Sequence, residues 1–457
     1  MTCETVIKLK QETPYIHFQH YEKGATLRAT EVKPKLDKFL VEKLGGEANI
    51  NKEWFVKSEN NKKALNYKLK FAVQGINTVS QAGNEICKAI DGNIRSEDER
   101  KKHANCSRDA INGMYFANMV NGTNYKRPLV GNDLEEKQKE IKKAYKETVF
   151  AARNITMSVV CFIPELMEEI CKYVQEFFVV ENFGSRQSKG FGGYSVKSIG
   201  DKQVNLSEKQ IADALCEKYG AAKCYKFAGG INNVETLERI RIIYSIIKSG
   251  ANYGYTKPKL YRRSLLFVYL KDKEKFNNGR GIGNEKAFLK QKGMAPIKVT
   301  RTDNVNNGYY RNQRDEDYRY TRALLGVGDN MFGPKRDEKV SIAETSKNIE
   351  RYPSTLFFKV VGNTVYYVGK RISEDVLGAS FKFSSSYQNN RQSKTLNVPS
   401  ENDGVDENFM DDFLEYCKKE LNNPNPREGD SLVQFFKVLF RNNNIKIEIK
   451  EACANGQ

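Results

Sequence analysis

The sequence predicts an α+β protein with two domains, and three observations support this prediction. The chain has 457 residues, which is too long for one ordinary hydrophobic core. Strand-like segments alternate with helical segments over residues 1–200. Residues 201–457 contain further strands, a hairpin and amphipathic helices, so we expect a second domain of related design, although the sequence shows no repeat.

A strand, a loop and a helix are predicted at the start of the chain. Residues 6–10 have strand-like alternation, and a glycine-containing loop follows at 21–28. Apolar residues then recur at helical spacing over 32–44. Thr30 is the expected N-cap of this helix, and Pro34 is acceptable only in its first turn.

A second strand and helix precede the most glycine-rich part of the chain. Residues 154–163 are rich in β-branched side chains and predict a strand. Pro164 ends this strand and opens a helix with an apolar face over 166–177. Gly184 is well placed to terminate that helix, and residues 194–196 form a further short strand.

This order of strands and helices is that of ferredoxin-like folds. We therefore expect an N-terminal ferredoxin-like domain over residues 1–200, with an insertion at about 45–150 that holds polar helices such as 134–149. Residues 201–457 are expected to form a C-terminal ferredoxin-like domain.

The second half has its own local signals. Ser207 and Gln210 form a possible capping box for a helix that ends at Tyr219. Gly362 and Asn363 separate two strands as a hairpin turn. The other predicted elements are strands at 265–270, 356–361, 364–368 and 445–449, helical or apolar segments at 409–421 and 432–440, and a polar surface loop at 384–408.

The composition excludes several classes of site. The nine cysteines include no Cys-x-x-Cys pair and there are only three histidines, so neither a metal site nor a disulfide framework is indicated, and no cofactor is expected. Residues 1–5 lack the features of a signal peptide, and no apolar run is long enough to cross a bilayer. We expect a soluble, cytoplasmic protein.

The net charge of +18 favours a polyanionic partner. Residues 251–322 hold 17 Lys and Arg against 7 Asp and Glu, with eight tyrosines interspersed. Cations can meet phosphates while aromatic rings stack on bases, so this segment suits single-stranded nucleic acid. A long solvated insertion is the alternative interpretation.

The loop at 184–193 contains four glycines and two cations, Arg186 and Lys189. Glycines let the backbone turn so that several N–H groups point outward together, and such a surface suits an RNA phosphate backbone. Phe191 is equally well placed to stack on a base or to anchor the loop in the core. The loop at 277–283 is also glycine-rich but lacks the ending of a P-loop, so nucleotide hydrolysis is not indicated.

With its setting between a helix and a strand, the 184–193 loop resembles the glycine-rich loop of the RAMP superfamily of CRISPR-associated proteins. Residues 13–14 with 24–34, residues 322–326 and residues 351–359 resemble one member, the two-domain head subunit of the type III-B Cmr complex. The resemblance implies two ferredoxin-like, RRM-related RAMP domains with helical and loop insertions. It also implies a non-catalytic subunit that holds the 3′ part of the guide RNA and the facing target RNA beside other type III effector subunits in antiviral defence.

The candidate RNA-binding residues come from three regions. They are Arg28, Lys33 and Lys35 at the start of the first helix; Gly184, Arg186, Lys189, Gly190, Phe191 and Gly192 in the glycine-rich loop; and Tyr255, Lys257, Lys259, Arg262 and Arg263 in the basic segment. Free N–H groups at a helix start attract phosphate, and guanidinium can grip it with two hydrogen bonds. No catalytic or metal-binding residues are predicted.

Two other functions stay open at this stage. The chain could be a RAMP endoribonuclease that processes precursor CRISPR RNA without a metal, with His17 or His20 as the general base. These histidines stand in the first loop, where the resembled family more often has small residues and glycine. The chain could also be a general RNA-binding module with an RRM-like face.

Overall fold

The computed structural model describes residues 3–16, 27–56, 64–78, 149–253, 260–271, 274–294, 314–327, 330–332, 339–345, 349, 352–385, 391–422, 432–440 and 447–454. Helices and antiparallel sheets are both prominent, so the predicted α+β class is confirmed. No helix in these ranges is long and apolar enough to cross a membrane.

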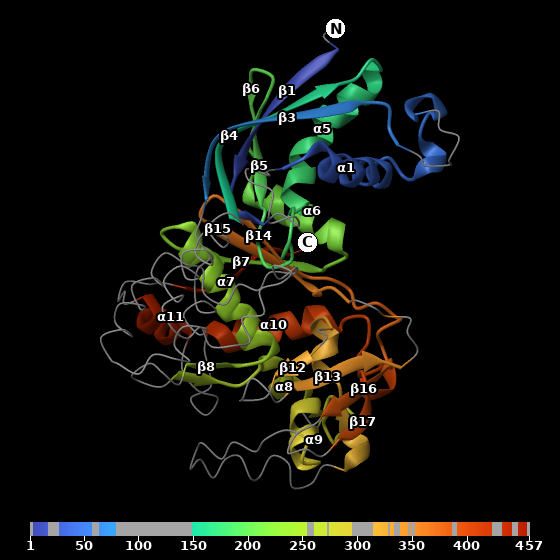
Figure 1. The fold of residues 1–457 in the computed structure, drawn as a ribbon, viewed down its shortest axis with the longest axis vertical. Helices are drawn as coiled ribbons and strands as arrows, with labels where there is room; N and C mark the ends of the chain where they lie inside the picture. Colours follow the sequence, from blue (N-terminus) through green and yellow to red (C-terminus); the bar gives the residue numbers. More distant parts are fainter. Residues whose placement is uncertain are drawn as a thin grey trace, which may run out of the picture.

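The first sheet forms the upper part of the molecule in Figure 1. Its main strands are β1 (Glu4–Gln11), β3 (Lys68–Thr78), β4 (Val149–Val160) and β5 (Tyr194–Ile199). They pair antiparallel in the spatial order β3-β4-β1-β5. The short β2 (Tyr15–Ile16) pairs with the first residues of β4, and β6 (Lys202–Gln203) pairs with β5 at the edge of the sheet. Helices α1 (Ala29–Lys43) and α5 (Pro164–Val180) cover one face, because alternate strand residues such as Ile7 and Met157 are apolar and pack against them.

The second sheet repeats this arrangement. Strands β7 (Lys223–Ala228), β14 (Leu356–Val361), β15 (Thr364–Gly369) and β18 (Lys450–Ala454) pair in the spatial order β14-β15-β7-β18. Helix α7 (Asn233–Lys248) follows its first strand, and α10 (Phe409–Asn422) precedes its last one. If the four main strands of each sheet are numbered 1 to 4 in chain order, both sheets have the spatial order 2-3-1-4.

The remaining elements connect or extend these two units. The remaining helices and strands are η1 (Glu47–Asn49), η2 (Lys52–Trp54), α6 (Glu208–Tyr219), β8 (Ala251–Tyr253), β9 (Leu260–Arg262), α8 (Leu265–Leu270), β10 (Gly283–Asn284), α9 (Glu285–Gln291), η5 (Asp315–Asp317), β11 (Tyr318–Arg319), η6 (Thr321–Leu325), β12 (Asn330–Phe332), β13 (Lys339–Glu344), β16 (Ser380–Ser385), β17 (Gln392–Asn397), η8 (Glu401–Asp403) and α11 (Leu432–Phe440). Four of these strands form a third sheet in the order β12-β13-β16-β17.

The two hydrophobic cores meet across the second sheet. One face of this sheet, with Phe358 and Tyr367, packs in the same core as α7, α8 and α10. The opposite face, with Phe357 and Tyr366, belongs to the core of the first sheet and α6. Figure 1 shows the second sheet between these two groups of helices. Both faces of the second sheet are therefore buried, whereas the first sheet has helices on one face.

Several local predictions are confirmed. Ser207 Oγ accepts a hydrogen bond from the Gln210 N–H at 3.3 Å, and Gln210 Oε1 accepts one from the Ser207 N–H at 2.9 Å, which completes the capping box of α6. Strands β14 and β15 form the predicted hairpin, with Val361 opposite Thr364. Helices α1, α5 and α10 occur where apolar periodicity predicts them.

Other predictions at element boundaries are wrong. Residues 265–270 form a helix rather than a strand, because Ser264 Oγ caps it by accepting from the Phe267 N–H at 3.3 Å. Helix α1 begins one residue after Arg28, so Thr30 is not its N-cap and Pro34 lies inside it. Helix α5 ends at Val180, so Gly184 does not terminate it.

The insertion and the C-terminal end also differ from expectation. Strand β3 lies inside the predicted insertion at 45–150, yet it pairs with β4 along most of its length. The polar segment predicted at 384–408 contains β17, which completes the third sheet. The last strand is Lys450–Ala454 instead of 445–449. The predicted polar helix at 134–149 lies almost entirely outside the described residues.

Candidate nucleic-acid interface

The glycine-rich loop lies between the two sheets, against strand β14. The Phe358 N–H donates to Ser188 O at 3.3 Å, and Asn182 Nδ2 donates to Phe358 O at 2.9 Å. Lys189 and Phe358 form an isolated parallel bridge. The loop therefore joins the first half of the chain to the second.

The loop glycines are required by the backbone. Gly192 has φ +65°, and a Cβ atom there would lie 1.8 Å from Phe183 O. Gly184 has φ +75°, and its Cβ would lie 2.3 Å from Ile16 O. Its N–H donates to Glu31 Oε1 at 2.6 Å. Gly190 is also buried, so these three predicted RNA-binding glycines serve the close packing of the loop.

Phe191 points into the protein. Its side chain is 3% exposed and belongs to the core that contains α7 and α8. Of the two roles that the sequence left open, the structure favours anchoring of the loop over stacking on a base.

Lys189 has an unusual environment for a cation. Its Nζ is buried, has no hydrogen-bond partner, and lies 2.6 Å from the centroid of the Tyr244 ring. Burial, together with the charges of Lys248 and Arg186, lowers the pKa of Lys189 well below its ordinary value. An ammonium group in this position is desolvated, and its contact with the Tyr244 ring is a cation–π interaction that replaces hydration only in part.

Further cations surround Lys189, and we call Arg186, Lys189, Lys248, Lys286 and Arg322 the cation cluster. Lys248 ends α7 and donates to Leu325 O at 2.9 Å and to Gly326 O at 2.6 Å. Burial and the charge of Arg322 lower the pKa of Lys248 to about 7. Burial and the charges of Lys290 and Arg322 lower the pKa of Lys286.

The carboxylate of Glu285 acts on Lys248, Lys286 and Arg322 of this cluster. Glu285 is buried and forms an ion pair with Arg322, and it also accepts a hydrogen bond from the Thr321 hydroxyl at 3.0 Å. Five basic side chains therefore meet at the junction of the loop, α7, α9 and η6, and an anion bound there would favour the charged forms of Lys189 and Lys248. The arrangement is suited to an anion such as a phosphate group.

The sequence pattern predicts Arg186 and Lys189 as site residues but not Tyr244, Lys248, Lys286 or Arg322. Arg322 lies in one of the stretches, 322–326, that carry the family resemblance, and this was the available signal. Lys248 lies in the last turn of a helix, where a basic residue is ordinary, so its sequence context gave no signal.

The predicted residues near the first helix are used within the fold. Lys33 Nζ donates to Asp37 Oδ2 at 2.7 Å and to Leu65 O at 2.8 Å. Lys35 Nζ donates to Glu181 Oε2, Asn182 O and Gln187 Oε1, at 2.9 to 3.1 Å, and thereby ties α1 to the glycine-rich loop. Arg28 is the half-buried N-cap residue of α1. None of the three lies in the cation cluster.

The predicted residues of the basic segment are not brought together by the structure. Arg262 is 1% exposed and its Nη2 donates to Glu420 O in α10, so this side chain is used within the fold. Arg263 beside it is half-buried. Tyr255, Lys257 and Lys259 lie outside the described residues. Tyr269, Tyr318 and Tyr320 of the same segment are core residues.

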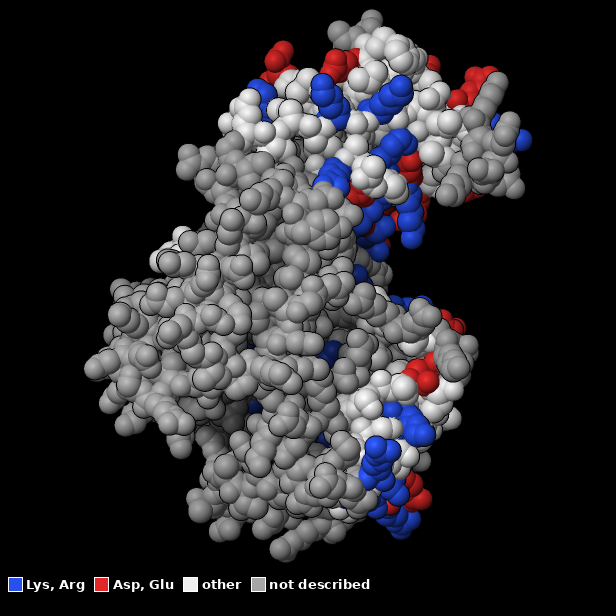
Figure 2. Space-filling view, in the orientation of Figure 1, with Lys and Arg blue, Asp and Glu red and all other residues white. Residues whose placement is uncertain are grey.

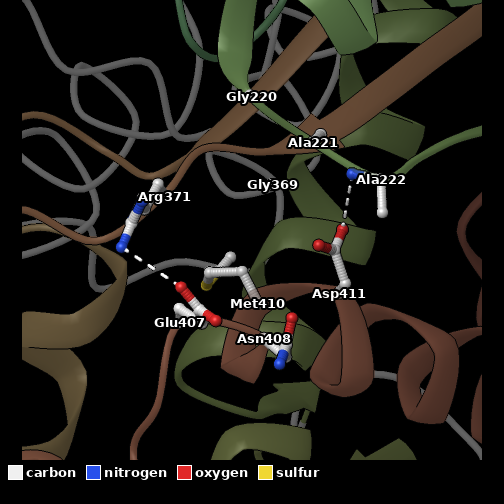
Figure 3. Close-up of a pocket in the computed structure, with 9 residues that line it drawn as sticks. All are labelled: Gly220, Ala221, Ala222, Gly369, Arg371, Glu407, Asn408, Met410 and Asp411. Atoms are coloured by element: carbon white, nitrogen blue, oxygen red, sulfur yellow. Dashed lines mark hydrogen bonds and ion pairs between the residues drawn. The ribbon is translucent and has the colours of Figure 1, made fainter.

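A separate pocket of about 290 Å³ lies between the end of α6 and the start of α10 (Figure 3). Arg371 in it lies 3.6 Å from Glu407, and Asp411 Oδ1 accepts from the Ala222 N–H at 3.1 Å. Burial raises the pKa of Asp411. Two carboxylates and one arginine do not favour a phosphate. No group of three metal-ligating side chains that could hold an ion occurs among the residues with assigned positions.

Two models of known protein families match the sequence over most of its length. The Cmr1 N-terminal domain model matches residues 2–251, and the Cmr1 C-terminal domain model matches residues 261–448. The chain belongs to the Cmr1 family. The resemblance to a CRISPR-associated subunit of the type III-B Cmr complex is therefore confirmed.

One solved structure that resembles the chain comes from the same family. The apo crystal structure of Cmr1 from Pyrococcus furiosus is 11% identical in sequence, with a TM-score of 0.35. The match covers 82% of this chain and 91% of that chain. No curated relative matches the sequence.

Proposed function

We propose that this Cmr1 family member is an RNA-binding structural subunit of a type III-B effector complex that acts in antiviral defence. It holds the 3′ part of the guide RNA and the facing target RNA, and other type III subunits are its protein partners. The observation that carries the proposal is the buried Nζ of Lys189, which lacks a hydrogen-bond partner and stands among like charges.

The cation cluster explains how an RNA backbone is held. A phosphate oxygen supplies the hydrogen-bond acceptor that Lys189 lacks, and its charge offsets the repulsion among Lys189, Lys248 and Arg322. The cluster is assembled from both halves of the chain, since Arg186 and Lys189 come from the loop and the others come from α7, α9 and η6. Bound RNA therefore also stabilises the contact between the two halves.

We also infer that each half is a ferredoxin-like RAMP domain, one over residues 1–200 and one over 201–457. The support is the β-α-β-β-α-β order and the shared strand order 2-3-1-4 of the two main sheets. Helix α6 then leads from the first domain into the second. The insertions occupy the region between β3 and β4, and the region between α7 and β14 that includes the basic segment 251–322.

An RNA titration of a double variant tests the proposal. Lys189→Met removes the buried cation at similar length, and Arg186→Asn removes the second charge while suiting the φ of +60° at that position. A matched control, Lys382→Met with Lys394→Asn, removes two exposed lysines from the third sheet.

We expect weaker binding of single-stranded RNA by the double variant and a salt slope that is shallower by about 1.4, since each phosphate contact contributes roughly 0.7. Wild-type affinity in the double variant, with the control also unchanged, would refute the proposed role of the cluster. The same mixtures report on cleavage: metal-independent cutting of repeat RNA would favour the endoribonuclease, whose His17 and His20 lie outside the described residues.

A further inference from the structure

The face of the first sheet that turns away from α1 and α5 carries exposed residues on β1, β3, β4 and β5. Along each strand, the inward residues are apolar and packed, while the alternate residues point outward. The outward residues of the described positions are Glu4, Val6, Lys8 and Lys10 on β1; Lys68, Lys70, Ala72 and Gln74 on β3; Asn154, Thr156, Ser158 and Val160 on β4; and Ser195 and Lys197 on β5. We call this surface the open face.

The strand register spreads lysines across the open face. Ser158 stands opposite Val6 on one side and Lys70 on the other. Thr156 stands between Lys8 and Ala72 in the same way. Lys68 and Lys70 are about 7 Å apart along β3, and Lys8 lies two strands, or about 10 Å, across from β3. Lys197 extends the positive surface to β5.

Four of the five lysines on the open face have no carboxylate partner among the described residues. Lys8, Lys68, Lys70 and Lys197 are exposed, and none of them forms an ion pair within the described part of the chain. Lys10 is the exception, since its Nζ lies 2.7 Å from Glu12 Oε2. Glu4 is the one carboxylate among the outward positions of these four strands. Figure 2 shows both basic and acidic side chains on the visible side of the upper part of the molecule, which contains this sheet.

The other outward side chains indicate the kind of partner. Hydroxyl and amide groups from Thr156, Ser158, Asn154 and Gln74 stand between the lysines and can bond to phosphate and ribose oxygens, whereas the Ser195 hydroxyl donates to Glu12 Oε1 at 2.6 Å. The outward positions named above include no aromatic ring, so base stacking is not offered there. Protein interfaces are depleted in lysine and enriched in aromatic residues, so this composition favours a polyanion over a protein partner.

We propose that the open face is a second RNA-binding surface, which holds the sugar–phosphate backbone of single-stranded RNA without reading its bases. The inference rests on the proposed function, because it extends the RNA contact beyond the cation cluster. The open face differs in chemistry from the cation cluster, because the cluster offers buried basic groups and the open face offers exposed lysines and hydroxyls on a sheet.

A quadruple variant of the full-length chain tests this inference. Lys8→Gln, Lys68→Gln, Lys70→Gln and Lys197→Gln change exposed strand positions and leave the packed face intact. The matched control changes Lys209, Lys382, Lys394 and Lys419 to Gln, which removes the same charge from exposed positions on α6, the third sheet and α10. Fluorescence anisotropy with oligouridylate and with oligoadenylate gives affinity and base preference over a range of salt concentrations.

We expect the open-face variant to lose about tenfold or more in affinity for both oligonucleotides at low salt, with a salt slope shallower by up to about 2.8. The control retains wild-type affinity.

If the open-face variant binds both oligonucleotides as the wild type does while the Lys189→Met, Arg186→Asn variant binds weakly, the open-face inference is overturned and the proposed function stands. If neither variant is weakened, both fail. Normal RNA binding with lost assembly of the Cmr complex would identify the face as a protein-docking surface, which also overturns the inference.

Discussion

Two buried lysines lead to opposite expectations for the same substitution. Lys189 Nζ has no hydrogen-bond partner and faces the Tyr244 ring. Lys359 Nζ is also buried but donates to Phe178 O at 2.6 Å, Glu181 O at 2.8 Å and Asn182 Oδ1 at 3.2 Å. We predict that Lys189→Met stabilises the RNA-free protein and that Lys359→Met destabilises it.

The magnitudes follow from these contacts. A buried polar group without a partner costs about 1–3 kcal/mol or more when charged, and the cation–π contact of Lys189 returns about 0.5–2 kcal/mol. Lys189→Met should therefore raise the free energy of unfolding by about 1 kcal/mol, which corresponds to about 2–4 °C in Tm for the unfolding of one domain of about 200 residues. Lys359→Met leaves three acceptors, two of them carbonyls at the end of α5, without a donor and should cost about 2–4 kcal/mol.

Differential scanning calorimetry with and without RNA measures both effects. We expect RNA to raise the Tm of the wild type more than that of Lys189→Met, since the variant has lost a phosphate contact. A lower Tm for RNA-free Lys189→Met, combined with undiminished stabilisation by RNA, would show that Lys189 is a structural residue and would refute this reasoning.

Two further predictions concern pH and the backbone. Burial lowers the pKa of Lys248 and of Lys359 to about 7, whereas both titrate near 10.4 in the unfolded chain. The unfolded chain then binds more protons between these values, so the free energy of unfolding should rise from about pH 7 to about pH 10; a fall over that interval in urea titrations would contradict the assignment. Gly192→Ala should destabilise by several times the roughly 1 kcal/mol expected for Gly200→Ala, because a Cβ at Gly192 would meet Phe183 O whereas one at Gly200 meets nothing within 4 Å. Equal melting temperatures for the two variants would show that the loop relaxes freely.

Local signals in the sequence predicted much of the fold. The capping box of α6 and the hairpin of β14 and β15 depend on residues a few positions apart, and both are present. Leu265–Leu270 was misassigned because a short, continuously apolar run does not show whether it is a strand or a helix. Strand β3 was missed because its identity comes from pairing with β4, which is distant in sequence.

The candidate site was only partly predictable for the same reason. The glycine-rich loop was recognised from composition, but the burial of Lys189 depends on Tyr244 and Phe358, which belong to the other half of the chain. Lys33 and Lys35 looked available because their acceptors, Leu65 O and Asn182 O, are backbone atoms of distant segments. Charge patterns showed that the chain favours a polyanion, whereas tertiary contacts determine which cations are free to meet it.

Ultraviolet crosslinking of the assembled ribonucleoprotein, with crosslinked peptides identified by mass spectrometry, tests the central claim most directly. The account predicts nucleotides attached to peptides that carry Lys189, Tyr244 or Arg322, with loss of those adducts in the Lys189→Met, Arg186→Asn variant. Crosslinks confined to other peptides, with none at the glycine-rich loop, α7 or η6, would contradict it.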